Sequence, residues 1–202
     1  VKGLTFAILK TVAMENVVDL PKKAFQNSIE KLREAGANIS EISVSSVGEA
    51  MDLTGLLYSP EAYATWRHKI EKSPDLMFEK ILERFRSGAN VLAADFINAW
   101  DKLIDLRKQY HSEVEAYDAV LIPTSPIIPP EVGRLVNDGD FYNSQNLLAL
   151  RNTRISNLMG GCSITLPTHT DSCGILIMGR PNEEERLLRL AQACELVLAR
   201  NR

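Results

Sequence analysis

Short apolar runs alternate with amphipathic stretches along the first part of the chain. Residues 4–9 are almost wholly apolar, which is typical of a strand that is covered on both faces. The stretch 19–36 carries apolar residues at helical spacing, with Pro21 in its first turn and Gly36 at its end. A second strand is predicted over residues 39–44. Strand, helix and strand within this length indicate a βαβ unit with parallel strands.

The middle of the chain has the pattern of helices. Ser73-Pro74-Asp75 is typical of a helix start. The apolar face expected on that helix consists of Phe78, Ile81, Leu82 and Phe85. A longer helix is predicted over residues 93–117, with charged residues on a solvated face. Its expected buried stripe consists of Phe96, Trp100, Leu103 and Val114.

A buried strand is predicted over residues 119–122, and it runs directly into a proline-rich segment. Proline has no backbone N–H to donate to a sheet, so the strand is expected to end at Pro123. The loop 123–126 would then lie at the carboxyl end of a strand. Ligands bind at that edge of open α/β sheets.

The last third of the chain returns to short elements separated by turn residues. In order, we expect a turn (137–140), a helix (144–158) that Gly160-Gly161 ends, and two strands (162–166 and 174–178). The polar segment 168–172 predicts a hairpin between those strands. A final helix is expected to begin near Asn182, with Arg200 and Arg202 at its favourable end. These elements predict an α/β fold, a mixed β-sheet flanked by helices, in one domain over residues 1–202.

Composition limits the class of protein. The 202 residues are 45% hydrophobic and 24% charged, as in a globular domain, and no apolar run reaches the roughly 18 residues of a membrane span. A formal net charge of -3 without a basic cluster predicts no direct contact with nucleic acid. Three cysteines without a CxxC pair favour reduced thiols over a disulfide framework or a zinc site. We therefore expect a cytoplasmic protein with no membrane partner.

Few residues suggest chemistry on their own. The sequence has no glycine-rich phosphate loop, no HExxH motif and no G-x-S-x-G elbow. Cys162 follows two glycines and could be a nucleophile, but it opens an apolar strand, so a buried structural role is favoured. His169 could act as a base, although a solvated hairpin residue is favoured. Arg84 could hold a carboxylate, yet its setting is that of a solvated helix face.

Several segments, taken in order, resemble the amidase-signature family. The matching segments are residues 3–9, 32–37, 117–126 (YD-apolar-PT-x-P), 153–160 (T…NLxG), 163–167, 174–179 (G-apolar-G) and 185–191. Each motif is short, but their order and spacing together are specific, and they cover nearly the whole chain. The resemblance implies the C-terminal part of the amidase-signature fold.

The resemblance also implies an activity, the hydrolysis of carboxamide C–N bonds by a serine nucleophile, a bridging serine and a lysine base. In the family a Gly/Ser-rich loop, upstream of the part matched here, supplies the serines. This chain contains no such loop. No catalytic residue is therefore assigned. Because the chain begins at Val1 and runs at once into a buried strand, we expect the C-terminal portion of an amidase, inactive alone.

Three substrate-binding residues follow from the same resemblance. The family's C-terminal half closes one side of the substrate pocket, so Thr124 and Ser125 of the proline-rich loop are the candidate polar groups. Arg84, four residues before Gly88, resembles an arginine that the A subunits of glutamine-dependent amidotransferases place near the substrate. The implied partner is a small-molecule amide, with no cofactor and no metal. An unprotected sheet edge or face would favour a homo-oligomer.

Three departures from the family pattern indicate which branch of the amidase-signature family the chain resembles more. Cys162, His169 and Cys173 stand where proline, glycine and proline are common. They favour a general amidase, or an allophanate-hydrolase-like or related urea-derivative hydrolase, over the tRNA-dependent branch. Two other hypotheses stay open. One is a piece of an amidotransferase A subunit, whose partners would be tRNA and a B subunit. The other is a non-catalytic α/β binding module.

Overall fold

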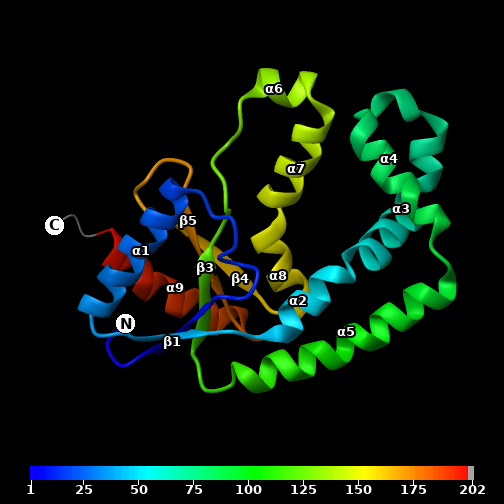
Figure 1. The fold of residues 1–202 in the computed structure, drawn as a ribbon. Helices are drawn as coiled ribbons and strands as arrows, with labels where there is room; N and C mark the ends of the chain where they lie inside the picture. Colours follow the sequence, from blue (N-terminus) through cyan, green and yellow to red (C-terminus); the bar gives the residue numbers. More distant parts are fainter. Residues whose placement is uncertain (200–202) are drawn as a thin grey trace.

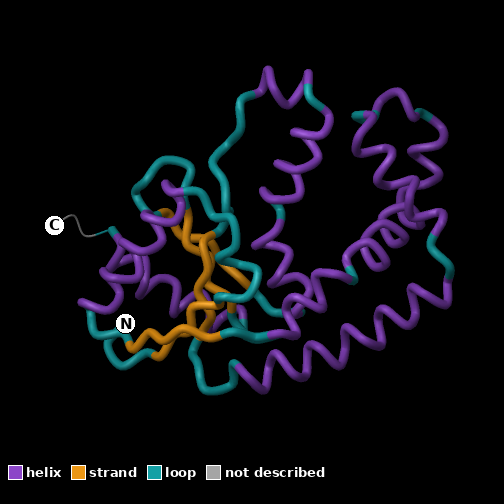
Figure 2. The backbone as a smooth tube through the Cα atoms, in the orientation of Figure 1, coloured by secondary structure: helices purple, strands orange, loops and turns teal. Residues whose placement is uncertain are grey.

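A computed structural model describes residues 1–199 and contains a five-stranded sheet with helices on both faces (Figures 1 and 2). The strands are β1 (Thr5–Leu9), β2 (Asn38–Ile42), β3 (Ala119–Pro123), β4 (Ser163–Pro167) and β5 (Gly174–Met178), in the order β2-β1-β3-β5-β4. β1 is parallel to β2 and β3, whereas β5 is antiparallel to β3 and β4. The predicted mixed sheet and α/β fold class are confirmed.

The first two strands and the helix between them form the predicted βαβ unit. Helix α1 (Asp19–Glu34) connects β1 to β2, and Phe6 pairs with Ile39 in the parallel register. Gly36 follows the helix in left-handed backbone, with φ 93°, which glycine adopts without steric cost. β2 ends at Ile42, two residues before its predicted end, and helix α2 (Ser45–Asp52) begins soon after.

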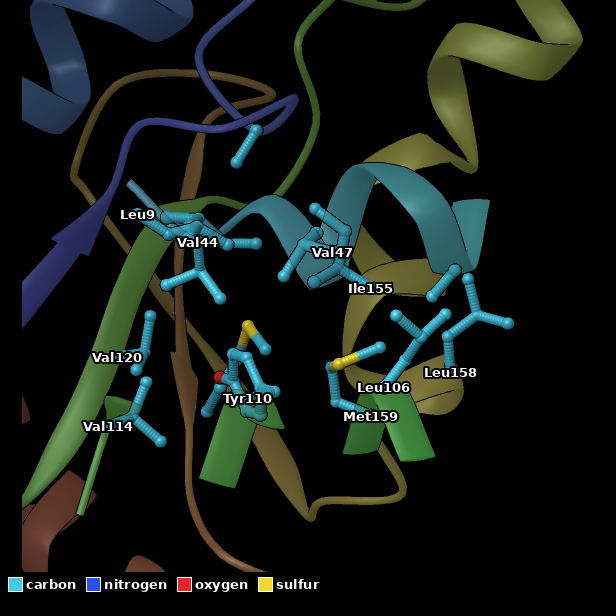
Figure 3. Close-up of a cluster of buried hydrophobic side chains, with 14 of the residues drawn as sticks. Leu9, Val44, Val47, Leu106, Tyr110, Val114, Val120, Ile155, Leu158 and Met159 are labelled. Carbon is cyan, nitrogen blue, oxygen red and sulfur yellow. The ribbon is translucent and has the colours of Figure 1, made fainter. Parts of the chain in front are cut away.

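Alternating residues of the central strands divide the core into two layers. Phe6 and Leu121 pack with α1 and α9 (Glu184–Leu198) on one face of the sheet. Leu9 and Val120 pack on the other face with α2, α5 (Ala93–Glu113) and α8 (Arg151–Met159), as Figure 3 shows. Successive strand residues point to opposite faces, so a sheet covered on both sides requires the unbroken apolar runs seen in the sequence.

Two helical arms project away from the sheet (Figure 1). The α3–α4 arm contains α3 (Thr54–Lys72), a 3₁₀ turn (Pro74–Leu76), α4 (Glu79–Ser87) and a second 3₁₀ turn (Gly88–Asn90). The α6–α7 arm contains α6 (Val132–Asn137) and α7 (Gly139–Ala149). Few described residues of either arm are buried, so local helical interactions hold much of this structure.

Two of the predicted central helices need correction. The helix expected to open at Ser73 is a 3₁₀ turn followed by α4, and Leu82 is the only buried member of its expected apolar face. Helix α5 ends at Glu113 rather than residue 117. Its buried stripe consists of Ala99, Leu103, Leu106 and Tyr110, whereas Phe96 and Trp100 are only partly covered. Trp100 packs against the edge of the core, and its ring meets that of Phe96 edge to face, with centroids 6.4 Å apart.

The helix predicted over residues 144–158 is two helices. It begins earlier, at Gly139, where the Asp138 carboxylate accepts a hydrogen bond from the Phe141 backbone N–H at 2.9 Å. The predicted turn over 137–140 is therefore mostly a helix junction and cap. Leu150 separates α7 from α8, which ends at Gly160 in left-handed backbone as the Gly160-Gly161 signal predicts.

The C-terminal hairpin is confirmed. β4 and β5 pair antiparallel, with Ile164 opposite Ile177, and the polar segment 168–172 joins them. Helix α9 begins at Glu184, close to its predicted start, but its N-cap is Glu183 rather than Asn182, whose φ is 60°. The expected basic residues Arg200 and Arg202 lie outside the described residues. Across residues 1–199, no helix combines the length and apolarity that crossing a bilayer requires.

Candidate substrate-binding surface

The proline-rich loop leaves the sheet where the sequence predicts. β3 ends at Pro123, and the Thr124 backbone N–H donates to the Gly174 carbonyl at 2.9 Å, which fixes the first residue of the loop to β5. Thr124 and Ser125 are both half-buried. The predicted pocket residues therefore lie at the carboxyl end of a central strand, held in place by a neighbouring strand.

Thr124 and Ser125 line an open hollow of about 770 Å³ together with the β4–β5 hairpin. Its remaining lining residues are Thr165, Pro167, His169, Thr170, Asp171, Ser172, Cys173 and Gly174. Five of the lining side chains carry hydroxyl groups, which both donate and accept hydrogen bonds. Such a surface suits a small polar molecule that has both amide N–H and carbonyl groups.

Gly174 allows two of those hydroxyls to meet. The Thr124 hydroxyl lies 3.3 Å from the Thr165 hydroxyl, so the contact spans from the end of β3 to β4, above β5. A Cβ at Gly174 would stand 2.8 Å from the Thr124 oxygen and 2.7 Å from the Thr165 methyl. A larger residue here would force the two threonines apart.

Ser125 has a partly structural role. Its hydroxyl donates to the Ile127 carbonyl at 3.0 Å and accepts from the Ile127 backbone N–H at 3.4 Å. These bonds close the proline-rich loop on itself and fix the direction of the hydroxyl. Ser125 therefore shapes the wall of the hollow, and Thr124 is the freer of the two predicted polar groups.

A buried polar pair that sequence reasoning missed connects this loop to helix α8. Fully buried Asn152 donates from Nδ2 to the carbonyls of Pro123 at 2.7 Å and Ala13 at 3.0 Å. Arg151, only 9% exposed, donates from Nε to Asn152 Oδ1 and from Nη2 to the Ala13 carbonyl. Burial lowers the pKa of Arg151, while Glu15 raises it. The pair ties the loops that follow β1 and β3 to one helix.

Arg84 lies apart from the hollow, between the two arms. Its Nη1 donates to Asn146 Oδ1 on α7 at 2.7 Å. The arms also meet where the Phe78 and Tyr142 rings contact edge to face, with centroids 5.2 Å apart. The structure thus brings Thr124 and Ser125 together and places Arg84 on a different surface, which α7 and α8 connect to the end of β3.

Arg154, on α8, was not singled out from the sequence. It is half-buried, and this burial lowers the pKa of its guanidinium. Tyr58 opposes that change, and the charge of Arg84 adds to it.

The thiols and the hairpin histidine show no sign of activation. The Cys162 thiol donates to the Arg180 carbonyl at 3.1 Å, and burial raises its pKa, which favours the unreactive thiol. Burial and then Asp171 raise the pKa of Cys173. His169 is exposed. All three cysteines are free, and within residues 1–199 no three potential ligands gather into a metal site.

A family model described as Amidase matches residues 1–188. Among curated proteins, the chain is 27% identical to a 2-amino-5-chloromuconic acid deaminase of Comamonas testosteroni over 98% of its own length and 44% of the relative's. It is also 27% identical to the A subunit of the glutamyl-tRNA(Gln) amidotransferase of Desulforamulus reducens, covering 96% of this chain and 45% of that one. The chain thus spans less than half the length of these relatives.

Solved structures show the same fold. The allophanate hydrolase of Kluyveromyces lactis superposes with a TM-score of 0.83 at 20% sequence identity, covering 98% of this chain and 33% of that one. At this identity the likeness concerns the fold alone. It extends over both arms as well as the sheet, because nearly the whole chain is covered.

Proposed function

Because this chain belongs to the amidase family, we propose that it forms one wall of the substrate pocket in an enzyme that hydrolyses carboxamide C–N bonds. The observation that carries the proposal is the family match over residues 1–188, which includes every described strand and both walls of the hollow. A hollow rich in hydroxyl groups at the carboxyl edge of β3 agrees with an amide substrate, which needs both donors and acceptors.

We assign the nucleophile to no residue of this chain. Burial raises the pKa of each of the three thiols, and the Gly/Ser-rich loop of the resemblance is absent from the sequence. A Ser-Ser-Lys triad in the remaining part of the complete enzyme would then attack the amide carbonyl. The 202 residues alone would be inactive, as a C-terminal pocket domain.

Thr124, Ser125 and Arg84 are the proposed substrate-facing residues. Thr124 offers a hydroxyl at the floor of the hollow, and Ser125 shapes the adjoining loop. Arg84 offers a guanidinium whose Nη1 is bonded to a neutral amide rather than to a carboxylate, so it keeps its full charge for a ligand. The deaminase among the relatives is named for an acid, which supports an anionic group on the substrate.

A second candidate is the amidotransferase A subunit. The similarity to the A subunit of a glutamyl-tRNA(Gln) amidotransferase is as high as that to the deaminase, at 27%. In that case glutamine would be the amide, and the assembly would include other subunits. Release of ammonia from glutamine in preference to simple amides would favour this candidate over a general amidase.

Ammonia release from a panel of amides, including glutamine and urea derivatives, tests the proposal. We expect release by the complete product of the gene and none by residues 1–202 alone. Cys162→Ala in the complete product serves as the control and should keep full activity, because its thiol only donates to a backbone carbonyl. Release by residues 1–202 alone would contradict the proposal, and no release by the complete product would favour a binding module.

A further inference from the structure

Two loops at the carboxyl edge of the sheet converge on one buried side chain, that of Asn152 on α8. β1 and β3 are adjacent and parallel, so the loops that follow them leave the sheet side by side. The Asn152 amide donates to the Pro123 carbonyl at 2.7 Å and to the Ala13 carbonyl at 3.0 Å. Its Oδ1 accepts from Arg151 Nε at 3.1 Å, and Asn152 has no exposed surface. The amide is therefore fully used in holding these two loops.

The loop after β1 contains a backbone conformation that needs such support. The Ala13 N–H donates to the Thr11 carbonyl at 2.6 Å, which places Val12 in a three-residue turn with φ 61°. A β-branched residue rarely adopts this left-handed conformation, and it persists only where surrounding contacts fix it. The Ala13 carbonyl accepts from Arg151 Nη2 at 3.2 Å as well as from Asn152, so α8 supplies two such contacts.

The same amide fixes the first residue of the proline-rich loop. The Pro123 carbonyl and the Thr124 N–H belong to one planar peptide unit, which is bound at both ends. Asn152 holds the carbonyl, and the Gly174 carbonyl accepts from the Thr124 N–H at 2.9 Å. With this plane fixed, the Thr124 side chain keeps its direction toward Thr165 and the hollow. Asn152 therefore acts on the hollow although it is not among the lining residues.

We infer that Asn152 is a positioning residue, which sets the Thr124 hydroxyl at the place where an amide substrate binds. The inference rests on the proposed function, because it takes Thr124 as a substrate-facing group. Since Asn152 acts through Thr124, its loss should weaken substrate binding and leave the bond-breaking step largely intact. The expected sign is a higher KM with a smaller change in kcat.

Kinetics of Asn152→Asp in the complete gene product test the inference, with butyramide and glutamine as the amides. Aspartate has nearly the same shape and keeps the acceptor for Arg151, but an ionised carboxylate donates to neither backbone carbonyl. We expect kcat/KM to fall roughly threefold to tenfold, chiefly through KM. Asn143→Asp is the matched control, since Asn143 is exposed on α7, and it should leave both constants unchanged.

A double-mutant cycle with Thr124→Val separates positioning from general damage. If Asn152 acts through the Thr124 hydroxyl, Asn152→Asp should have little further effect once that hydroxyl is gone. Losses that multiply in the double variant, or a native kcat/KM in Thr124→Val alone, would overturn the inference. Asn152→Ala removes the donors without adding a charge, and it takes the place of Asn152→Asp in the same cycle if the aspartate variant does not fold.

Amide hydrogen exchange gives a readout that does not depend on catalysis. The Thr124 N–H should exchange faster in Asn152→Asp, whereas the Leu121 N–H within β3 should keep its native rate. An unchanged rate at Thr124 would overturn the inference even if the protein hydrolyses both amides. If it hydrolyses neither, the proposed function fails for these amides, and exchange at Thr124 alone then supports or overturns the positioning role of Asn152.

Discussion

Every residue of β3 is buried, whereas α6 and α7 bury none of theirs. The sheet is covered on both faces by helices, so its stability comes from apolar burial and from strand pairing over long sequence separations. The arms instead depend on a few contacts, such as the Phe78–Tyr142 ring pair and the Arg86–Glu71 ion pair. One region is built to be stable, and the other exposes most of its side chains, including apolar ones such as Leu76 and Val136.

The largest expected effect separates core from arm. Leu121→Ala removes a fully buried side chain from the central strand and should lower the free energy of unfolding by about 3–5 kcal/mol. Leu76→Ala, at a position 89% exposed in the α3–α4 arm, should change it by less than about 0.5 kcal/mol. Urea unfolding of both variants measures the difference. Similar losses in the two variants would refute the division.

A smaller effect should stay within one arm. A Cβ at Gly88 would lie 2.1 Å from the Ser59 carbonyl oxygen, so Gly88→Ala must push α4 away from α3, at a cost of about 1–3 kcal/mol. Amide hydrogen exchange should accelerate in α3 and α4 but not in β3. Gly55→Ala is the matched control, since nothing lies near its added Cβ. Faster exchange throughout the sheet would mean that arm and sheet unfold together.

The smallest effect concerns an exposed contact on the α3–α4 arm. A hydrogen bond from Arg86 lowers the pKa of Glu71, and desolvation opposes this only in part. A carboxyl whose folded pKa is lowered stabilises the fold above its usual pKa and loses that contribution as the pH falls. NMR titration of the Glu71 carboxyl should show a midpoint below the usual value, and Arg86→Gln should move it upward. An unmoved midpoint would show that the ion pair does not persist in solution.

The sheet was the predictable region because its signals are local. Continuous apolar runs at residues 4–9 and 119–122 are enough to identify strands covered on both faces, and Pro123 identifies where the second run must end. The polar segment 168–172 between two apolar runs similarly identifies the hairpin. The resulting position of Thr124 and Ser125 at a strand end followed from these same signals.

The arms were less predictable because tertiary contacts decide their boundaries. Helix α3 continues through Pro60, a residue that normally ends or bends a helix, and α6 is too short to give a clear period. Asn146, the hydrogen-bond partner of Arg84, is 62 residues away along the chain. It belongs to α7, whose start the sequence pattern did not locate correctly. Such a pairing depends on how two arms meet, which no local pattern records.

The threonine pair above Gly174 gives the hollow a reversible polarity. One hydroxyl proton is used in the 3.3 Å contact between Thr124 and Thr165, which leaves the other proton and several lone pairs unassigned. Rotation about two C–O bonds exchanges which threonine donates, without moving any backbone atom. The same floor can then offer a proton to a carbonyl oxygen or a lone pair to an N–H, so one small glycine gives this surface two hydrogen-bonding states.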